Sequence, residues 1–211
     1  MKALIALAGS LVVSASASAA FTGFAGDFVD VGQPAGMNVL NLYVTFDAPE
    51  HLVAIAGLPG DGLAITTDGV FYQDPAGGAT APTNFLVGII PSLAWDTYVD
   101  IGLEYHDGED ATSTVGLEWG ASSLTTEATG GGSWYITPDD AQGNGDMVFI
   151  GKFATDGMYV MGEGIVVQSD ASYVEGQSFM YSIPAPGALA LLGLAGLAAG
   201  APPVGPPAEV L

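Results

Sequence analysis

Two acidic clusters carry the oxygen ligands that a calcium ion prefers. One cluster spans residues 107–110 and the other spans residues 139–146, and glycines inside both allow tight turns. The candidate ligands are Asp107, Glu109 and Asp110 in the first cluster, and Asp139, Asp140, Asn144 and Asp146 in the second. Neither cluster has the spacing of an EF-hand loop. Two interpretations therefore stay open: a calcium site, or acidic loops that are simply in contact with water.

Catalytic side chains are scarce in the rest of the chain. It has no cysteine, no Gly-x-Ser-x-Gly or His-Glu-x-x-His motif, and only two histidines, His51 and His106, which we expect at the surface. A glycosidase needs two carboxylates across a cleft, and nothing among the 23 acidic residues selects such a pair. We therefore expect a protein that is not an enzyme and has no cofactor, with calcium as the alternative. A secreted glycan-active enzyme is the third interpretation.

An exposed aromatic ring could hold a carbohydrate by stacking against it. Tyr98 is the aromatic residue for which the sequence predicts exposure, because it alternates with Val99 and so points to the opposite face of a strand. We name Tyr98 as the candidate stacking residue. The alternative is that its ring belongs to the core, as aromatic rings of β-domains usually do.

The charge balance restricts the partners of this protein. Two basic residues stand against 23 acidic ones, which gives a net charge of −21. Such a chain repels phosphate backbones, so we expect no nucleic acid as a partner, and anionic lipid surfaces are disfavoured for the same reason. Cations, a basic protein or a neutral polysaccharide remain. Without cysteines the fold has no disulfides and depends on its packed core.

Short segments in which apolar and polar residues alternate are separated by turn residues. We expect the strands that they form to position the candidate ligands and the stacking residue. Strands are expected at 37–46, 51–56, 63–66, 97–105, 115–119, 134–137, 147–153, 159–168 and 177–183. A turn of helix is expected near 83–86 or 138–142. The pattern predicts an all-β protein: an antiparallel β-sandwich or jelly roll forming one domain over residues 21–183, with apolar helical segments at both termini.

The first 20 residues have the pattern of a secretory signal peptide. A positive residue, Lys2, precedes an apolar run over 3–13 and a stretch of small residues over 14–20. Signal peptidase would cut after Ala19 or Ala20. We therefore expect an exported protein.

The other end of the chain has a second apolar run. It follows Pro184, Ala185 and Pro186 and covers residues 187–201, which as a helix would span about 22 Å, less than a bilayer core of about 30 Å. Alone it is a short membrane anchor. A Pro-rich stretch, 202–211, follows and is expected to be disordered.

An export signal, a β-rich body, Pro184-Ala185-Pro186 and a Leu/Ala/Gly run together resemble a PEP-CTERM protein in which alanine replaces the central glutamate. The resemblance implies that an exosortase-type enzyme recognises residues 184–186. It also implies transient retention in the inner membrane, processing, and delivery to the outer surface or extracellular matrix of a bacterium that makes exopolysaccharide.

One departure from this family concerns the last residues. The family ends in a cluster of Arg or Lys, whereas residues 202–211 contain no basic residue. We hypothesise that a frameshift turned Arg codons into Pro, Ala and Gly codons, and the neighbouring frames of the coding DNA would test it. The sequence thus predicts a non-enzymatic surface or matrix protein, with a calcium-assisted carbohydrate-binding module as the alternative.

Overall fold

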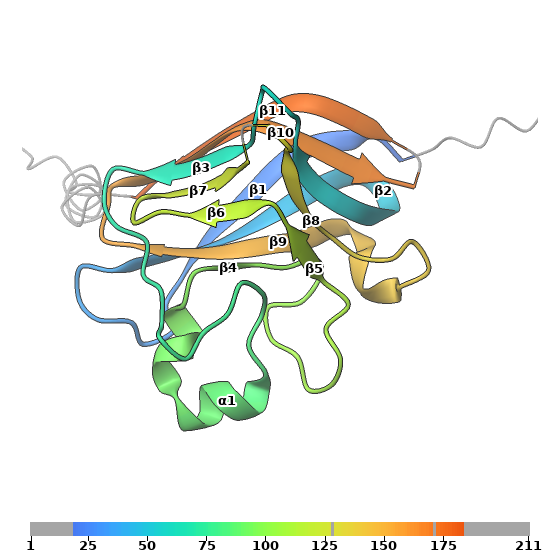
Figure 1. Ribbon diagram of the computed structural model, residues 1–211. Coiled ribbons are helices and arrows are strands. Elements are labelled where there is room, and N and C mark those ends of the chain that lie inside the picture. Colours follow the sequence, from blue (N-terminus) through green and yellow to red (C-terminus); the bar gives the residue numbers. More distant parts are fainter. Residues whose placement is uncertain (1–18, 128, 171, 184–211) are drawn as a thin grey trace, which may run out of the picture.

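Antiparallel strands make up most of the chain described by the computed structural model, which comprises residues 19–127, 129–170 and 172–183 (Figure 1). The strands are β1 (Phe21–Val29), β2 (Asn38–Gly57), β3 (Ala64–Thr67), β4 (Tyr98–Val99), β5 (Ser113–Val115), β6 (Leu117–Trp119), β7 (Ser123–Thr126), β8 (Gly132–Tyr135), β9 (Asn144–Thr155), β10 (Tyr159–Ser169) and β11 (Tyr173–Ser182). Three short helical elements are α1 (Asn84–Ile89), η1 (Pro91–Trp95) and η2 (Ala141–Gly143). The paired strands among these residues are all antiparallel, so the all-β prediction is confirmed.

The long strand β2 connects two groups of strands. Its first part pairs with β1 and β9, and its second part pairs with β8 and β10. The sequence predicted separate strands over 37–46 and 51–56, and this is wrong because the chain continues as one strand through Pro49. The ladder with β9 is interrupted between Thr45 and Glu50. Pro49 is tolerated there because its missing N–H is not needed by a partner.

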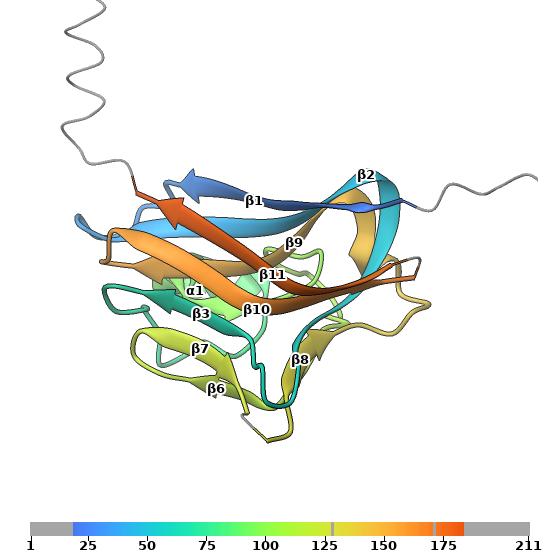
Figure 2. The ribbon, with the colours of Figure 1, turned by 90° about the horizontal axis from the view of Figure 1, so that it is seen from above.

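One apolar cluster fills the space enclosed by these strands. Leu40, Leu42 and Val44 of β2 alternate into it and are fully buried. Buried residues of β9 and β10 complete it, among them Ile150, Phe153, Val160, Ile165 and Val167. Tyr181 on β11 donates its hydroxyl to the backbone oxygen of Phe24 on β1 at 2.8 Å, and Figure 2 shows these two strands passing close together.

Two predicted strands are shorter than expected for identifiable reasons. Of residues 97–105 only β4 is extended, because the chain turns at Gly102, whose φ of +85° is strained for any other residue. Gly116, with φ +61°, divides the expected strand over 115–119 into β5 and β6. The apolar run over 85–90 lies in α1 apart from Ile90, and Thr83 caps the helix through its side-chain oxygen.

The apolar segments predicted at the termini, over residues 3–13 and 187–201, lie outside the described residues. Within the described part of the chain, no helix has the length and apolar character to cross a membrane.

Candidate functional site

Gln142, in η2, joins the two predicted acidic clusters. Its side-chain nitrogen donates to Asp110 Oδ1 at 3.0 Å, and its backbone N–H donates to Asp140 Oδ1 at 2.9 Å. The same side-chain nitrogen lies 3.1 Å from Oδ1 of Asp100, a residue that the sequence did not single out. The structure therefore brings one carboxylate from each cluster to a single residue, where protein donors occupy both.

The other members of the clusters do not converge on this point. Asp107 accepts a hydrogen bond from the Asn84 side chain at 2.8 Å, which directs it toward α1. The remaining candidate ligands are exposed: Glu109, Asp139, Asn144 and Asp146. In residues 19–127, 129–170 and 172–183, no group of three or more His, Cys, Asp or Glu side chains is arranged to hold a metal ion.

Asp100 and Asp110 form a pair of carboxyl groups with opposite pKa shifts. Asp100 is fully buried, and burial together with the charge of Asp110 raises the pKa of Asp100 to about 8. Burial also acts to raise the pKa of Asp110, but hydrogen bonds from Gln142 and Thr112 hold that pKa below its ordinary value. The pair therefore retains a proton to higher pH than an ordinary carboxyl group does. Because no solvent reaches Asp100, we assign this proton a structural role.

Tyr98 is not a surface residue, and its prediction as a stacking platform is wrong. Its side chain is fully buried and packs 6.3 Å from the Phe149 ring, measured between ring centroids. Its hydroxyl donates to the backbone oxygen of Glu104. The alternation argument fails because β4 is covered on both faces, so both of its residues are buried.

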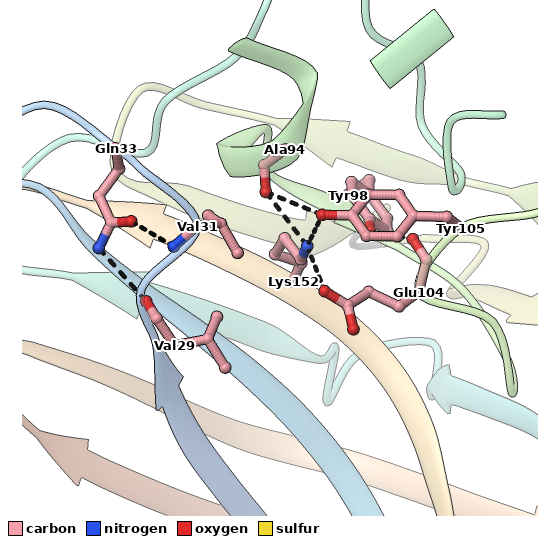
Figure 3. A network of polar contacts seen from close by, with 8 residues as sticks. All are labelled: Val29, Val31, Gln33, Ala94, Tyr98, Glu104, Tyr105 and Lys152. Carbon is pink, nitrogen blue, oxygen red and sulfur yellow. Dashed lines mark hydrogen bonds and ion pairs between the residues drawn. The ribbon is translucent and has the colours of Figure 1, made fainter. Parts of the chain in front are cut away.

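Lys152, on β9, lies beside Tyr98 and is fully buried (Figure 3). Its ammonium group donates to Glu104 Oε1 at 2.7 Å, to the Tyr105 hydroxyl at 2.6 Å and to the Ala94 backbone oxygen at 3.1 Å. It also lies 4.3 Å from the centroid of the Tyr105 ring. Burial lowers the pKa of Lys152, and the carboxylate of Glu104 opposes that shift. This network ties β9 to η1 and to the loop after β4.

The chain contains the tripeptide Thr-Asp-Gly twice, at 67–69 and 155–157, and the structure places the two copies against each other. Asp68 Oδ1 accepts the Met158 N–H, and Asp156 Oδ1 accepts the Val70 N–H, both at 2.7 Å. The hydroxyls of Thr67 and Thr155 lie 2.9 Å apart. We call this reciprocal arrangement the Thr-Asp-Gly clasp. The repeated tripeptide is the signal in the sequence from which the clasp could have been found.

An open pocket of about 590 Å³ lies beside the clasp. Its lining is mostly apolar and includes Met37, Val70, Tyr72, Trp119 and, from the clasp, Asp156. The segment after β3 forms one wall, because the Phe71 N–H donates to the Ala121 oxygen at 2.8 Å and the Tyr72 N–H to the Ala154 oxygen at 2.9 Å. A pocket of this size is in the range of small-ligand sites, about 300–1,000 Å³. Its residues come from four separate segments of the chain, so no local sequence pattern marks it.

His51 differs from its prediction as a surface residue. It is buried on β2, with Nδ1 3.1 Å from Asp170 Oδ2 and Nε2 2.7 Å from the Asp140 backbone oxygen. Both partners are acceptors, so a ring nitrogen that carries a proton donates to the partner beside it. His106 is half-buried, and its Nδ1 lies 2.7 Å from the Gly108 oxygen.

The residues predicted for processing are only partly described. Ala19 is buried and Ala20 is exposed. The Ala20 N–H donates to Asp47 Oδ1 at 2.7 Å. The predicted sorting motif, Pro184, Ala185 and Pro186, lies outside the described residues. No protein-family model matches this chain, and no curated protein or solved structure matches it either.

Proposed function

We propose that this chain is an exported protein of the outer surface or extracellular matrix of a bacterium, with a non-enzymatic structural or binding role. Signal peptidase removes residues 1–19, and an exosortase-type enzyme processes the tail at Pro184-Ala185-Pro186 after transient retention in the inner membrane. The sequence of both ends supports this proposal.

The observation that best supports a non-enzymatic role is the buried position of Lys152. Of the 23 acidic residues all but Glu209 lie in the described part of the chain, where Lys152 is the only lysine or arginine. Because Lys152 is fully buried, the described surface carries carboxylates and neither lysine nor arginine. Such a surface makes copies of the protein repel one another, and it also repels polyanions. This suits a domain that lies among acidic polymers without binding them.

We further propose that the strands joined by β2 form a β-sandwich of the jelly-roll kind over residues 21–183. Support comes from β2, which pairs with β1 and β9 in its first part and with β8 and β10 in its second, while both groups contribute to one apolar cluster.

A calcium-assisted carbohydrate-binding module is the second candidate. Asp110 and Asp140, one from each acidic cluster, both accept hydrogen bonds from Gln142, so calcium would have to use their other carboxylate oxygens. Titration with Ca²⁺ while following thermal unfolding tests it: calcium bound by the folded state raises the melting temperature. An unchanged melting temperature at millimolar Ca²⁺ would exclude it.

The test of the main proposal is localisation in a bacterium that encodes an exosortase-type enzyme. When the full chain is expressed, we expect its processed form in the matrix fraction, with Ala20 as the first residue, because the new α-ammonium group would then lie at the carboxylate of Asp47. The double variant Pro184→Ala, Pro186→Ala should instead accumulate unprocessed in the membrane fraction. Retention of Met1 and cytoplasmic accumulation of both forms would contradict the proposal.

A further inference from the structure

The pocket beside the Thr-Asp-Gly clasp is a feature that the proposed function does not use. We propose that it binds a neutral saccharide, with one face of the sugar ring stacked on Trp119. The inference rests on the proposed function in one respect: a protein outside the cell is exposed to polysaccharide.

The aromatic wall of the pocket supplies the stacking surface. Trp119, at the end of β6, packs one side against the core and lines the pocket, and Tyr72 lines it as well. The C–H groups on one face of a pyranose ring are apolar and pack well on an indole. Asp156 adds a carboxylate at the edge of the pocket, where an oxygen can accept hydrogen bonds from sugar hydroxyls.

The charge of the protein decides which sugars can enter. Recognition of a carboxylate, sulfate or phosphate group uses Arg or Lys. In the described residues the only such side chain, Lys152, is fully buried in its own network and does not line the pocket. Asp156 would repel an anionic ligand in addition. The pocket therefore selects neutral sugars over uronic acids or sulfated sugars.

The pocket is also held in shape before a ligand arrives. Val70 is fixed by Asp156 through the clasp, and the two residues that follow Val70 are bound by backbone hydrogen bonds on opposite sides, to Ala121 and Ala154. At the β6–β7 turn, the Gly120 N–H donates to the Ser123 oxygen at 2.7 Å. Binding to such a site requires little ordering of the chain, which favours measurable affinity for a small ligand.

The experiment measures binding of single sugars to the full chain by calorimetry and tryptophan fluorescence. The probes are glucose, galactose, N-acetylglucosamine and cellobiose, with glucuronate as the charged counterpart. We expect saturable binding of at least one neutral probe, at least about tenfold weaker binding of glucuronate, and about tenfold weaker binding of the neutral probe to Trp119→Ala. Tyr135→Ala is the matched control, because Tyr135 is an exposed aromatic residue that does not line the pocket, and it should bind as the unchanged protein does.

Thermal unfolding of each variant shows whether it folds, and Trp119→Phe, which keeps a ring, should bind more tightly than Trp119→Ala. Equal binding by Trp119→Ala and the unchanged protein, or tighter binding of glucuronate than of glucose, would overturn the proposal. Filling of the pocket by a second copy, seen as dimerisation that Trp119→Ala abolishes, would overturn it as well. None of these outcomes depends on localisation, so failure here is distinct from failure of the proposed function.

Discussion

At Gly157, in the Thr-Asp-Gly clasp, the protein has no room for a side chain. A Cβ atom there would lie 2.4 Å from Thr67 Oγ1 and 2.6 Å from the Gly69 nitrogen. We expect Gly157→Ala to lower the free energy of unfolding by about 2 kcal/mol, because one of the two turns must move away from the other. Chemical denaturation measures this change.

The control for that substitution is Gly78→Ala. Gly78 has an ordinary backbone conformation, and nothing lies within 4 Å of the position that its Cβ would occupy. Its replacement should change the free energy of unfolding by no more than about 0.5 kcal/mol. Equal effects of the two substitutions would mean that the clasp contributes no rigidity.

Alternation in the sequence does not always predict correctly which single residues are exposed. The pattern assigned Tyr98 to the surface, because a half-buried strand exposes every second residue. In the structure β4 is buried on both faces, and Trp119 lines the pocket instead. The difference depends on which loops cover a strand, and these loops are distant in sequence.

Among the elements, β9 depends on the ion pair between Lys152 and Glu104. Lys152 has no exposed side-chain surface, whereas the Glu104 side chain is 37% exposed. Glu104→Gln leaves a buried ammonium group without its carboxylate, and we expect it to cost about 3 kcal/mol of unfolding free energy. Lys152→Met removes the buried charge and leaves Glu104 partly in water, so it should cost about 1 kcal/mol or less. Denaturant titration of the two variants compares these costs.

Glu109→Gln is the matched control for Glu104→Gln, because Glu109 is an exposed glutamate in the same segment between β4 and β5. It should be neutral within about 0.5 kcal/mol. A larger cost for Lys152→Met than for Glu104→Gln would show that packing of the lysine stem, and not its charge, holds β9 against η1.

Most strands could be predicted from the sequence because their apolar residues alternate over enough positions. The strands expected at 147–153, 159–168 and 177–183 lie within β9, β10 and β11, except that Ile183 follows the end of β11. The strand expected over 97–105 is short because the chain turns at Gly102, and Asp100 just before this turn is buried in a polar network that links it to Thr112 and Gln142. In an alternating pattern, an aspartate whose carboxyl group is buried cannot be told from one that is exposed.

For the whole molecule, the buried carboxyl groups predict an unusual dependence of stability on pH. Burial raises the pKa of Asp100 to about 8 and that of Asp96 to about 6, both above the ordinary value of 3.8. A raised pKa means that the folded state binds the proton more tightly than the unfolded state does. The stabilisation is therefore complete below pH 3.8 and is lost as the pH rises, through about 6 for Asp96 and about 8 for Asp100.

We therefore expect the melting temperature to fall between about pH 5 and pH 8, whereas loss of stability at acid pH is the usual behaviour. One such group contributes at most about 1.4 kcal/mol per pH unit, which for a protein of this size corresponds to roughly 3–5 °C per pH unit. The lowered pKa of Lys152 acts in the opposite direction, in a window that ends at its ordinary value of 10.5. Calorimetry at several pH values and constant ionic strength measures the slope.

Two variants show which buried carboxyl group causes the change of melting temperature with pH. Above about pH 6.5 the proton on Asp96 is already lost, so the slope there belongs to Asp100 and should become nearly flat in Asp100→Asn. Asp96→Asn should keep the slope above pH 6.5 and reduce it only at lower pH. If Asp100→Asn retains the full slope above pH 6.5, the proton on Asp100 does not set the pH dependence there, and the prediction is wrong. In the unchanged protein the slope should persist in added salt, because salt screens exposed charges far more than it affects a buried carboxyl group.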